Sequence, residues 1–215
     1  MTRKLLILAL FLATPAVAET TMLDPRLQDA GGAVAQLVLA QNVFALARAR
    51  KDALAVISAG CLSAAIVPND VPRQPQDAAE VTAAPYPEAP EMFAVAQTMV
   101  TGNDLLAELL NRAMRSTSRL PARMVTRSAL IIDASAQQTF RIPFFGNALA
   151  EVAVIGDGSA NLDLEIADTE KATICLAQGP TDQAYCDFVP AENGLFTITV
   201  TNRSDTPASY ALVTN

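Results

Sequence analysis

The sequence predicts an α+β protein in which helices and strands occupy separate parts of the chain. Apolar residues recur at helical spacing in two blocks before residue 120, and they alternate with polar residues in short runs after residue 129. A stretch with six prolines, at 68–90, separates the two helical blocks. The pattern favours an N-terminal all-α part, built as helical hairpins or a bundle, and a C-terminal all-β sandwich.

The first 18 residues have the three parts of a secretory signal peptide. Arg3 and Lys4 precede the apolar run 5–13, and Ala16 and Ala18 stand at the positions of a cleavage site. The apolar run is much shorter than the roughly 20 residues of a membrane-spanning helix. We therefore expect cleavage after Ala18 and a mature protein in the periplasm or outside the cell, without a membrane span.

Residues 19–67 are predicted to form a helical hairpin. Leu27, Val34 and Phe44 belong to an apolar stripe with helical spacing. A break is expected at 50–52, where Asp52 can cap a second helix over 53–66 by accepting the unpaired N–H groups of its first turn.

Residues 68–90 are predicted to be an extended linker, because proline lacks a backbone donor and disfavours helix at the preceding residue. A second hairpin is expected over 91–120, interrupted at 102–104 and packed against the first. One helical layer cannot hide its own apolar stripes, so the helices either pack on the sandwich or self-associate.

Residues 129–215 are predicted to form the sandwich. Phe196, Ile198 and Val200 alternate with threonines, which is typical of a strand with one buried and one wet face. Eight strands are expected, at 130–133, 139–144, 150–155, 162–167, 173–176, 185–189, 195–201 and 209–213.

This C-terminal part resembles the pre-peptidase C-terminal family. The resemblance lies in the order and spacing of Gly-Asp-Gly-Ser-Ala-Asn-Leu-Asp-Leu at 156–164, Ile-Cys at 174–175, Cys186, Gly-Leu-Phe-Thr-Ile at 194–198 and Tyr210. It implies a jelly-roll-like sandwich of a kind that accompanies secreted peptidases and other enzymes, and some members bind matrix polymers or calcium. Helices joined to such a sandwich also resemble a group of exported bacterial proteins, for which the resemblance implies no activity.

The sequence departs from the family pattern around its acidic turn. Ser159 and Asn161 stand where carboxylates are common, and Glu165 stands where an aromatic residue is common. Asp157, Asn161, Asp163 and Asp168 could still supply oxygen ligands to calcium. The alternative is that Asp157 and Asn161 hold a turn while Asp163 points outward from a strand.

The cysteines fit an exported protein. Cys175 and Cys186 flank a loop of ten residues, and in an oxidising compartment they are expected to form a disulfide rather than remain two buried thiols. Cys61 lies in an apolar context and is expected to be a small buried residue. An intermolecular disulfide or a redox role is its alternative.

Composition argues against most catalytic chemistry. The chain has no histidine, which removes the usual general base and the commonest metal ligand. Without Arg3 and Lys4, 13 basic residues remain against 22 acidic ones, so the net charge of about −9 disfavours nucleic acid as a partner. No cofactor is expected, apart from the calcium ion considered above.

The sequence therefore predicts an exported, non-enzymatic binding or assembly module that acts on another envelope protein or polymer. A calcium-dependent binding module, or a carboxylate hydrolase using the region from Asp157 to Asp168, is the alternative.

Overall fold

The structure is a computed structural model that describes residues 32–73, 85–117 and 122–215. The predicted signal peptide, the first residues of the predicted first helix and the middle of the predicted linker lie outside the described residues. Helices occupy the N-terminal part of the described chain and strands predominate in its C-terminal part, as the sequence predicts.

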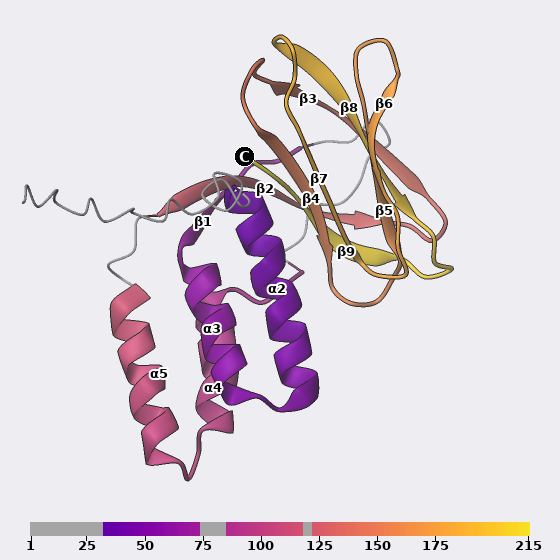
Figure 1. Cartoon of the computed structure of the whole chain (residues 1–215). Helices are drawn as coiled ribbons and strands as arrows, with labels where there is room; N and C mark the ends of the chain where they lie inside the picture. Colours follow the sequence, from indigo (N-terminus) through magenta and orange to yellow (C-terminus); the bar gives the residue numbers. More distant parts are fainter. Residues whose placement is uncertain (1–31, 74–84, 118–121) are drawn as a thin grey trace, which may run out of the picture. The chain divides into compact units, whose positions relative to one another are not determined.

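Four helices form two consecutive pairs, which run antiparallel in Figure 1. Helices α2 (Ala33–Arg50) and α3 (Ala53–Ala64) are joined by Lys51, whose left-handed backbone ends α2, and by Asp52. Asp52 Oδ1 accepts a hydrogen bond from the Ala55 amide at 3.1 Å, so the predicted cap is present. The second pair consists of α4 (Ala89–Met99) and α5 (Asp104–Thr117).

The four helices share one apolar core. Phe44 of α2, Val56 of α3 and Met92 of α4 are buried in it, and Leu110 is the buried residue that α5 adds. The rest of the apolar stripe of α5 stays open, because Leu105 is 72% exposed and Met114 is 44% exposed. Among the described residues, no helix has both the length and the apolar character needed to cross a membrane.

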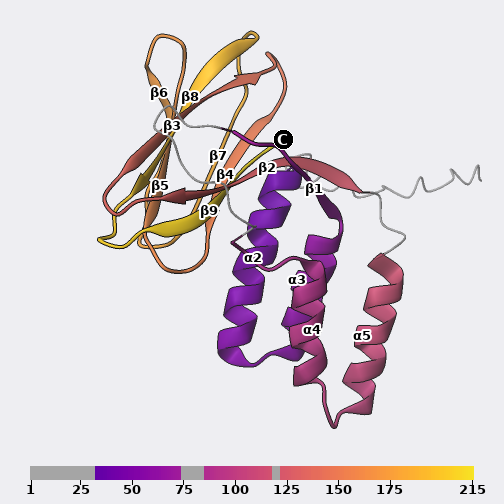
Figure 2. The ribbon, with the colours of Figure 1, turned by 180° about the vertical axis from the view of Figure 1, so that it is seen from behind.

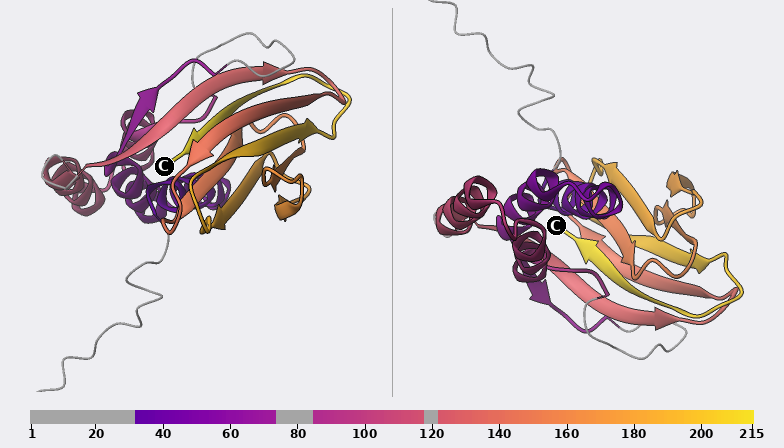
Figure 3. Two further views of the ribbon diagram at one scale, coloured as in Figure 1. Left: turned by 90° about the horizontal axis from the view of Figure 1, so that it is seen from above. Right: turned by 90° about the horizontal axis from the view of Figure 1, so that it is seen from below.

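Eight strands form the sandwich, in two sheets that Figure 3 shows from its ends. Sheet A has the order β1-β2-β9-β4-β7 and sheet B the order β3-β8-β5-β6, so without β1 each sheet contributes four strands, as in a jelly roll. The strands are β2 (Arg123–Ile132), β3 (Gln137–Phe144), β4 (Ala150–Gly156), β5 (Leu162–Ala167), β6 (Thr173–Ala177), β7 (Gln183–Phe188), β8 (Gly194–Asn202) and β9 (Ala208–Thr214).

The main core of the sandwich lies between the two sheets. Leu164, Ile198 and Leu212 are buried there without measurable exposure. Phe196, Ile198 and Val200 of β8 face this core as predicted, whereas Thr197 and Thr199 are only half-buried.

The ninth strand corrects the sequence prediction. Strand β1 (Ile66–Asp70) lies where a helix end and the start of the linker were expected, and it pairs in parallel with β2 from Ile66↔Arg123 to Asp70↔Arg127. Strand β2 accordingly begins at Arg123, seven residues before the predicted Leu130. Pro68 fits because β1 is an edge strand, where a missing donor can face away from the sheet. Figure 3 shows β1 beside β2.

The outer face of sheet A is also covered. Val34 and Leu37 of α2 pack with Ile155 of β4 and Ala211 of β9 in a second apolar cluster. This explains why every residue of β4 is buried. Packing on the sandwich is therefore the option that α2 takes, as Figure 2 shows from the rear.

A buried carboxylate joins α2 to the sandwich. Glu151 of β4 has no exposed surface and accepts hydrogen bonds from the amides of Val34 at 3.4 Å and Ala35 at 3.1 Å. Tyr185 Oη donates a third at 2.9 Å. The carboxylate thus meets the positive end of the helix dipole, where a negative charge is stabilised.

A candidate binding cleft beside Arg127

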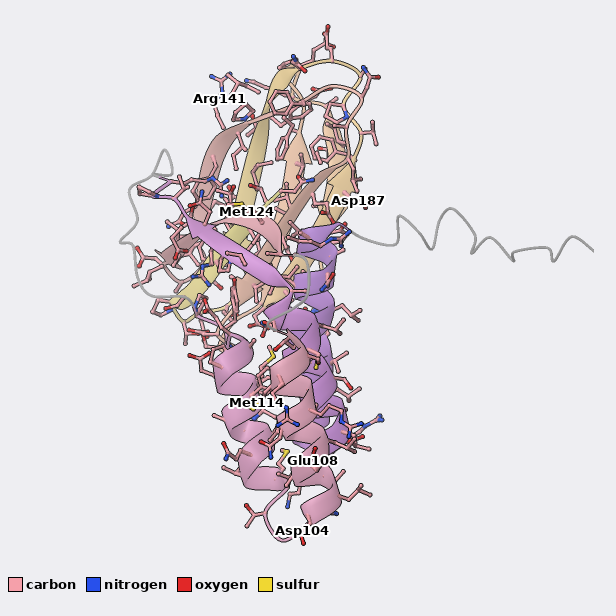
Figure 4. The ribbon with its side chains drawn as sticks, turned by 90° about the vertical axis from the view of Figure 1, so that its left-hand side faces the viewer. Asp104, Glu108, Met114, Met124, Arg141 and Asp187 are labelled. Atoms are coloured by element: carbon pink, nitrogen blue, oxygen red, sulfur yellow. A yellow bond between two sulfur atoms is a disulfide. The ribbon has the colours of Figure 1, made fainter. Side chains whose placement is uncertain are left out.

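A cleft of about 420 Å³ opens where the helices meet the edge of sheet A. It is lined by residues of all four helices, of β1, and of β2 near Arg127. Leu37, Ile66 and Phe93 give it apolar walls, and Met114 and Thr117 of α5 form one side. Its volume lies within the ~300–1,000 Å³ usual for ligand sites. Figure 4 labels Met114 on α5 and Met124 near the start of β2.

Arg127 forms the polar end of the cleft. Its side chain is 8% exposed and holds Asp70 with two hydrogen bonds, Nε to Oδ1 at 2.6 Å and Nη2 to Oδ2 at 3.0 Å. Nη1 donates to Glu88 Oε1 at 2.5 Å and to Tyr86 Oη at 3.3 Å. One guanidinium therefore ties β2 to β1 and to the residues that lead into α4.

Two carboxylates near this end are partly exposed. The side chains of Glu88 and Asp70 are 42% and 67% exposed, but only Glu88 lines the cleft together with Arg127. The hydrogen bonds from Arg127 hold the pKa of Asp70 below its usual value. Burial raises the pKa of Tyr86, so its hydroxyl stays protonated at neutral pH. The cleft combines apolar walls with one lining cation, Arg127, and one partly exposed lining carboxylate, Glu88.

This arrangement is suited to binding. The guanidinium of Arg127 and the hydroxyl and carboxylate of Tyr86 and Glu88 are engaged with one another. An apolar hollow with a few fixed polar groups suits recognition of a partly apolar ligand.

Sequence reasoning missed all four residues of this polar cluster. Asp70, Tyr86 and Glu88 fall in the predicted linker, and Arg127 precedes the predicted start of the sandwich. The β-branched pair Ile66-Val67 was a local signal for a strand. The pairing of that strand with β2 had no local signal.

The predicted calcium ligands lie around β5 and mostly have partners. Asp157 accepts hydrogen bonds from the amides of Ser159 and Ser209 and from the Ser159 hydroxyl. Asp163 binds Arg203 Nε at 2.6 Å and is buried. Asp168 accepts from two amides of its own turn.

These residues do not converge on one point. Asp168 follows the end of β5 whereas Asp163 stands at its start, so about 16 Å of extended chain separates them. In the described ranges, no three acidic or thiol side chains gather closely enough to hold a metal ion. Asn161 Oδ1 is buried and accepts no hydrogen bond, so a cation could serve as its missing partner. Calcium binding stays a prediction.

The predicted disulfide is present. Cys175 of β6 and Cys186 of β7 are bonded, with their Cα atoms 6.1 Å apart, so the bridge connects an edge of sheet B to an edge of sheet A. Cys61 is a free thiol that packs, half-buried, against the helical core, and burial raises its pKa.

Comparison with known proteins gives similarity in structure only. No family model matches the sequence, and no curated protein matches it. Solved structures similar to part of the chain include the pre-peptidase C-terminal domain of a Bacillus anthracis collagenase, with a TM-score of 0.34 at 10% identity over 40% of this chain and 86% of that one. A periplasmic inhibitor of g-type lysozyme from Aeromonas hydrophila has a TM-score of 0.32 at 17% identity over 42% and 84%. The carbohydrate-binding module CBM36 has a TM-score of 0.28 at 10% identity over 40% and 77%.

Proposed function

We propose that this chain is an exported, non-enzymatic binding module that holds an apolar segment of another envelope protein in the cleft beside Arg127. The observation that carries the proposal is the cleft itself, an apolar hollow of about 420 Å³ with the buried Arg127 and its partly exposed partner Glu88 at one end. Apolar walls favour side chains of a protein over a polar polymer, because their burial is the main driving force for association.

The rim has one carboxylate that a partner can reach. Glu88 lines the cleft and is 42% exposed, although it is already paired with Arg127. A segment that carries a lysine or arginine next to its apolar residues would pair with the exposed part of Glu88. Export is supported by the disulfide, which persists in oxidising compartments.

The cleft can be tested without knowing the partner. A neutral fluorescent probe, N-phenyl-1-naphthylamine, is expected to bind the whole chain and brighten. Met114→Lys places a charge on the cleft wall and should weaken binding at least about five-fold, because a bound apolar probe would cover the charge and remove it from water. Leu105→Lys is the matched control, because it lies on the same helix, is 72% exposed and does not line the cleft.

The partner is sought by capture from periplasmic extract with the same three proteins. The expected result is a protein that the wild type and Leu105→Lys retain and Met114→Lys loses. Equal probe binding by all three proteins, or equal capture by all three, would contradict the proposal. An envelope polymer retained in the same cleft-dependent way would keep the site and change the partner.

Calcium dependence is the second candidate, and the unpaired Asn161 Oδ1 is the observation in its favour. A bound ion stabilises the folded state by mass action, so calcium should raise the melting temperature relative to a chelator. Asn161→Ala should abolish that rise. Equal melting temperatures with calcium and with chelator would rule out this candidate.

A further inference from the structure

A second cleft, of about 410 Å³, lies between sheet A and β3, an edge strand of sheet B. Thr126 of β2 and Thr214 of β9 line it from sheet A, and Phe140 to Pro143 of β3 line it from sheet B. It shares no lining residue with the cleft beside Arg127. Its character is different, because its described lining residues include two arginines, Arg73 and Arg141, and no aspartate or glutamate.

Arg73 enters this cleft from the chain that follows β1. Residues 71–73 continue alongside β2, where the Val71 amide donates to Arg127 O at 2.8 Å and Ser128 Oγ donates to Val71 O at 2.6 Å. This places the Arg73 guanidinium against sheet A. Nη2 donates to Thr214 Oγ1 at 2.7 Å, and Nη1 makes longer bonds of 3.4 Å to Ser128 Oγ and Leu212 O.

All acceptors of Arg73 among the described residues are neutral. Three of the five N–H groups of a guanidinium are thus used, which leaves the Nε–H and one Nη2–H without an acceptor in the described part of the chain. Arg127 is paired with two carboxylates, whereas no carboxylate is paired with Arg73 in the described part of the chain. Burial lowers the pKa of Arg73, as expected for a cation removed from water without an anion beside it.

Arg141 of β3 adds a second cation to the same cleft, and Figure 4 labels it on the sandwich. It is exposed, and the side chains of the described lining residues include no carboxylate, although Asn215, the last residue of the sequence, also lines the cleft. The chain as a whole has 22 acidic residues and 15 basic ones. Two arginines without an acidic side chain among the described residues of the same lining are therefore a local departure from the charge of the protein.

We infer that this cleft binds an oxyanion, a carboxylate or phosphate group, which accepts hydrogen bonds from the free N–H groups of Arg73 while Arg141 adds charge from the rim. A guanidinium presents its donors in a planar fork that matches both kinds of group. The Thr214 hydroxyl accepts from Arg73, so its own proton is available as a further donor. The inference goes beyond the proposed function, because it assigns a separate site and a separate ligand.

The test is a nuclear magnetic resonance titration of the whole chain with sodium phosphate and, separately, with sodium acetate, each at constant ionic strength set by sodium chloride. The expected result is a saturable shift of the Arg73 Nε–H signal and of the Thr126 and Thr214 amides with at least one probe. A response to phosphate alone would show that the site prefers a tetrahedral anion. A response to acetate as well would show that the site also binds carboxylates.

Two variants and a control make the test specific. Arg73→Gln should weaken binding by about ten-fold and Arg141→Gln by about five-fold, as expected for losing one nearby cation. Arg141 is exposed, so its substitution tests the site even where Arg73→Gln fails to fold. Arg50→Gln, in the last turn of α2, removes an equal charge elsewhere and should leave binding unchanged. Shifts that equal those with chloride alone, or equal affinities in Arg141→Gln and Arg50→Gln, would overturn the inference.

Discussion

At the scale of single residues, Arg127 and Arg73 show that the same side chain has different consequences in different surroundings. Arg127 is buried between two carboxylates, and Arg73 is half-buried beside neutral oxygens. Arg127 holds three segments together, whereas Arg73 has N–H groups without an acceptor in the described part of the chain. Partner chemistry, and not residue type, separates a structural ion pair from a candidate anion site.

Replacing Arg127 tests its structural role. Arg127→Met should lower the free energy of unfolding by about 1–3 kcal/mol at pH 7, less than for a fully buried pair because both carboxylates are partly exposed. Urea unfolding measures this. Arg50→Met is the control and should change stability by less than about 0.5 kcal/mol.

The same pair predicts a pH dependence. The folded-state pKa of Asp70 is lowered, so its contribution is complete above its unfolded value of about 3.9 and is lost as the pH falls through the folded value. The stability difference between wild type and Arg127→Met should therefore be constant near neutral pH and narrow below about pH 4. A difference that stays constant down to pH 2 would contradict the assignment.

At the scale of elements, the junction of α2 and β4 depends on a close approach. A Cβ on Gly32 would lie 1.7 Å from Glu151 Oε2, so only glycine fits where the helix begins on the buried carboxylate. Gly32→Ala should cost about 1–3 kcal/mol through this overlap. Gly179→Ala is the control, since its Cβ would meet only Thr181 Oγ1 at 4.0 Å.

A double-mutant cycle isolates the cause of that cost. Glu151→Ala should itself be destabilising, because it leaves the Tyr185 hydroxyl and two amides without their acceptor. In its background the penalty of Gly32→Ala should fall to less than half, since the overlapping side chain is gone. Strictly additive losses in urea unfolding would show that the overlap is not the cause.

The disulfide is the second test at this scale. Replacing Cys175 and Cys186 together by serine should lower stability by about 2.5–3 kcal/mol, the chain-entropy value for a short loop, and reductant should have the same effect on the wild type. Cys61→Ser controls for loss of a thiol and should leave the response to reductant unchanged. Insensitivity of the wild type to reductant would rule out a stabilising bridge.

At the scale of the whole described chain, three apolar cores share elements. Helix α2 contributes Val34 and Leu37 to the cluster on sheet A and Phe44 to the helical core. Strand β1 belongs to sheet A although the helices flank it in sequence. Neither half can therefore bury its apolar surface alone.

This sharing predicts one cooperative unfolding transition. Calorimetry of the whole chain should give a single peak whose calorimetric and van't Hoff enthalpies agree. A fragment covering 19–120 should expose Ile66 and Leu37 and self-associate, because β1 loses its partner β2. A monomeric, cooperatively folded fragment would contradict this view.

Much of the secondary structure was predictable because its signals are local. The Asp52 cap, the alternation in β8 and the short loop between Cys175 and Cys186 can each be read within a few residues. The calcium residues were predicted from the same kind of signal, and the structure gives three of the four a competing partner. Local spacing shows which residues are near one another in sequence. It does not show which of their oxygens already accept hydrogen bonds from other parts of the chain.

The sequence by itself determined the helices of the N-terminal part, most strands of the sandwich and the cysteines that bridge it, since each depends on periodicity or short loops. Only the tertiary structure decided that a proline-containing segment becomes β1, that Glu151 is buried under α2, and where the two clefts open. Those features join residues more than 50 positions apart. Their energies depend on partners that no local pattern identifies, because burial and pairing arise only when the chain has folded.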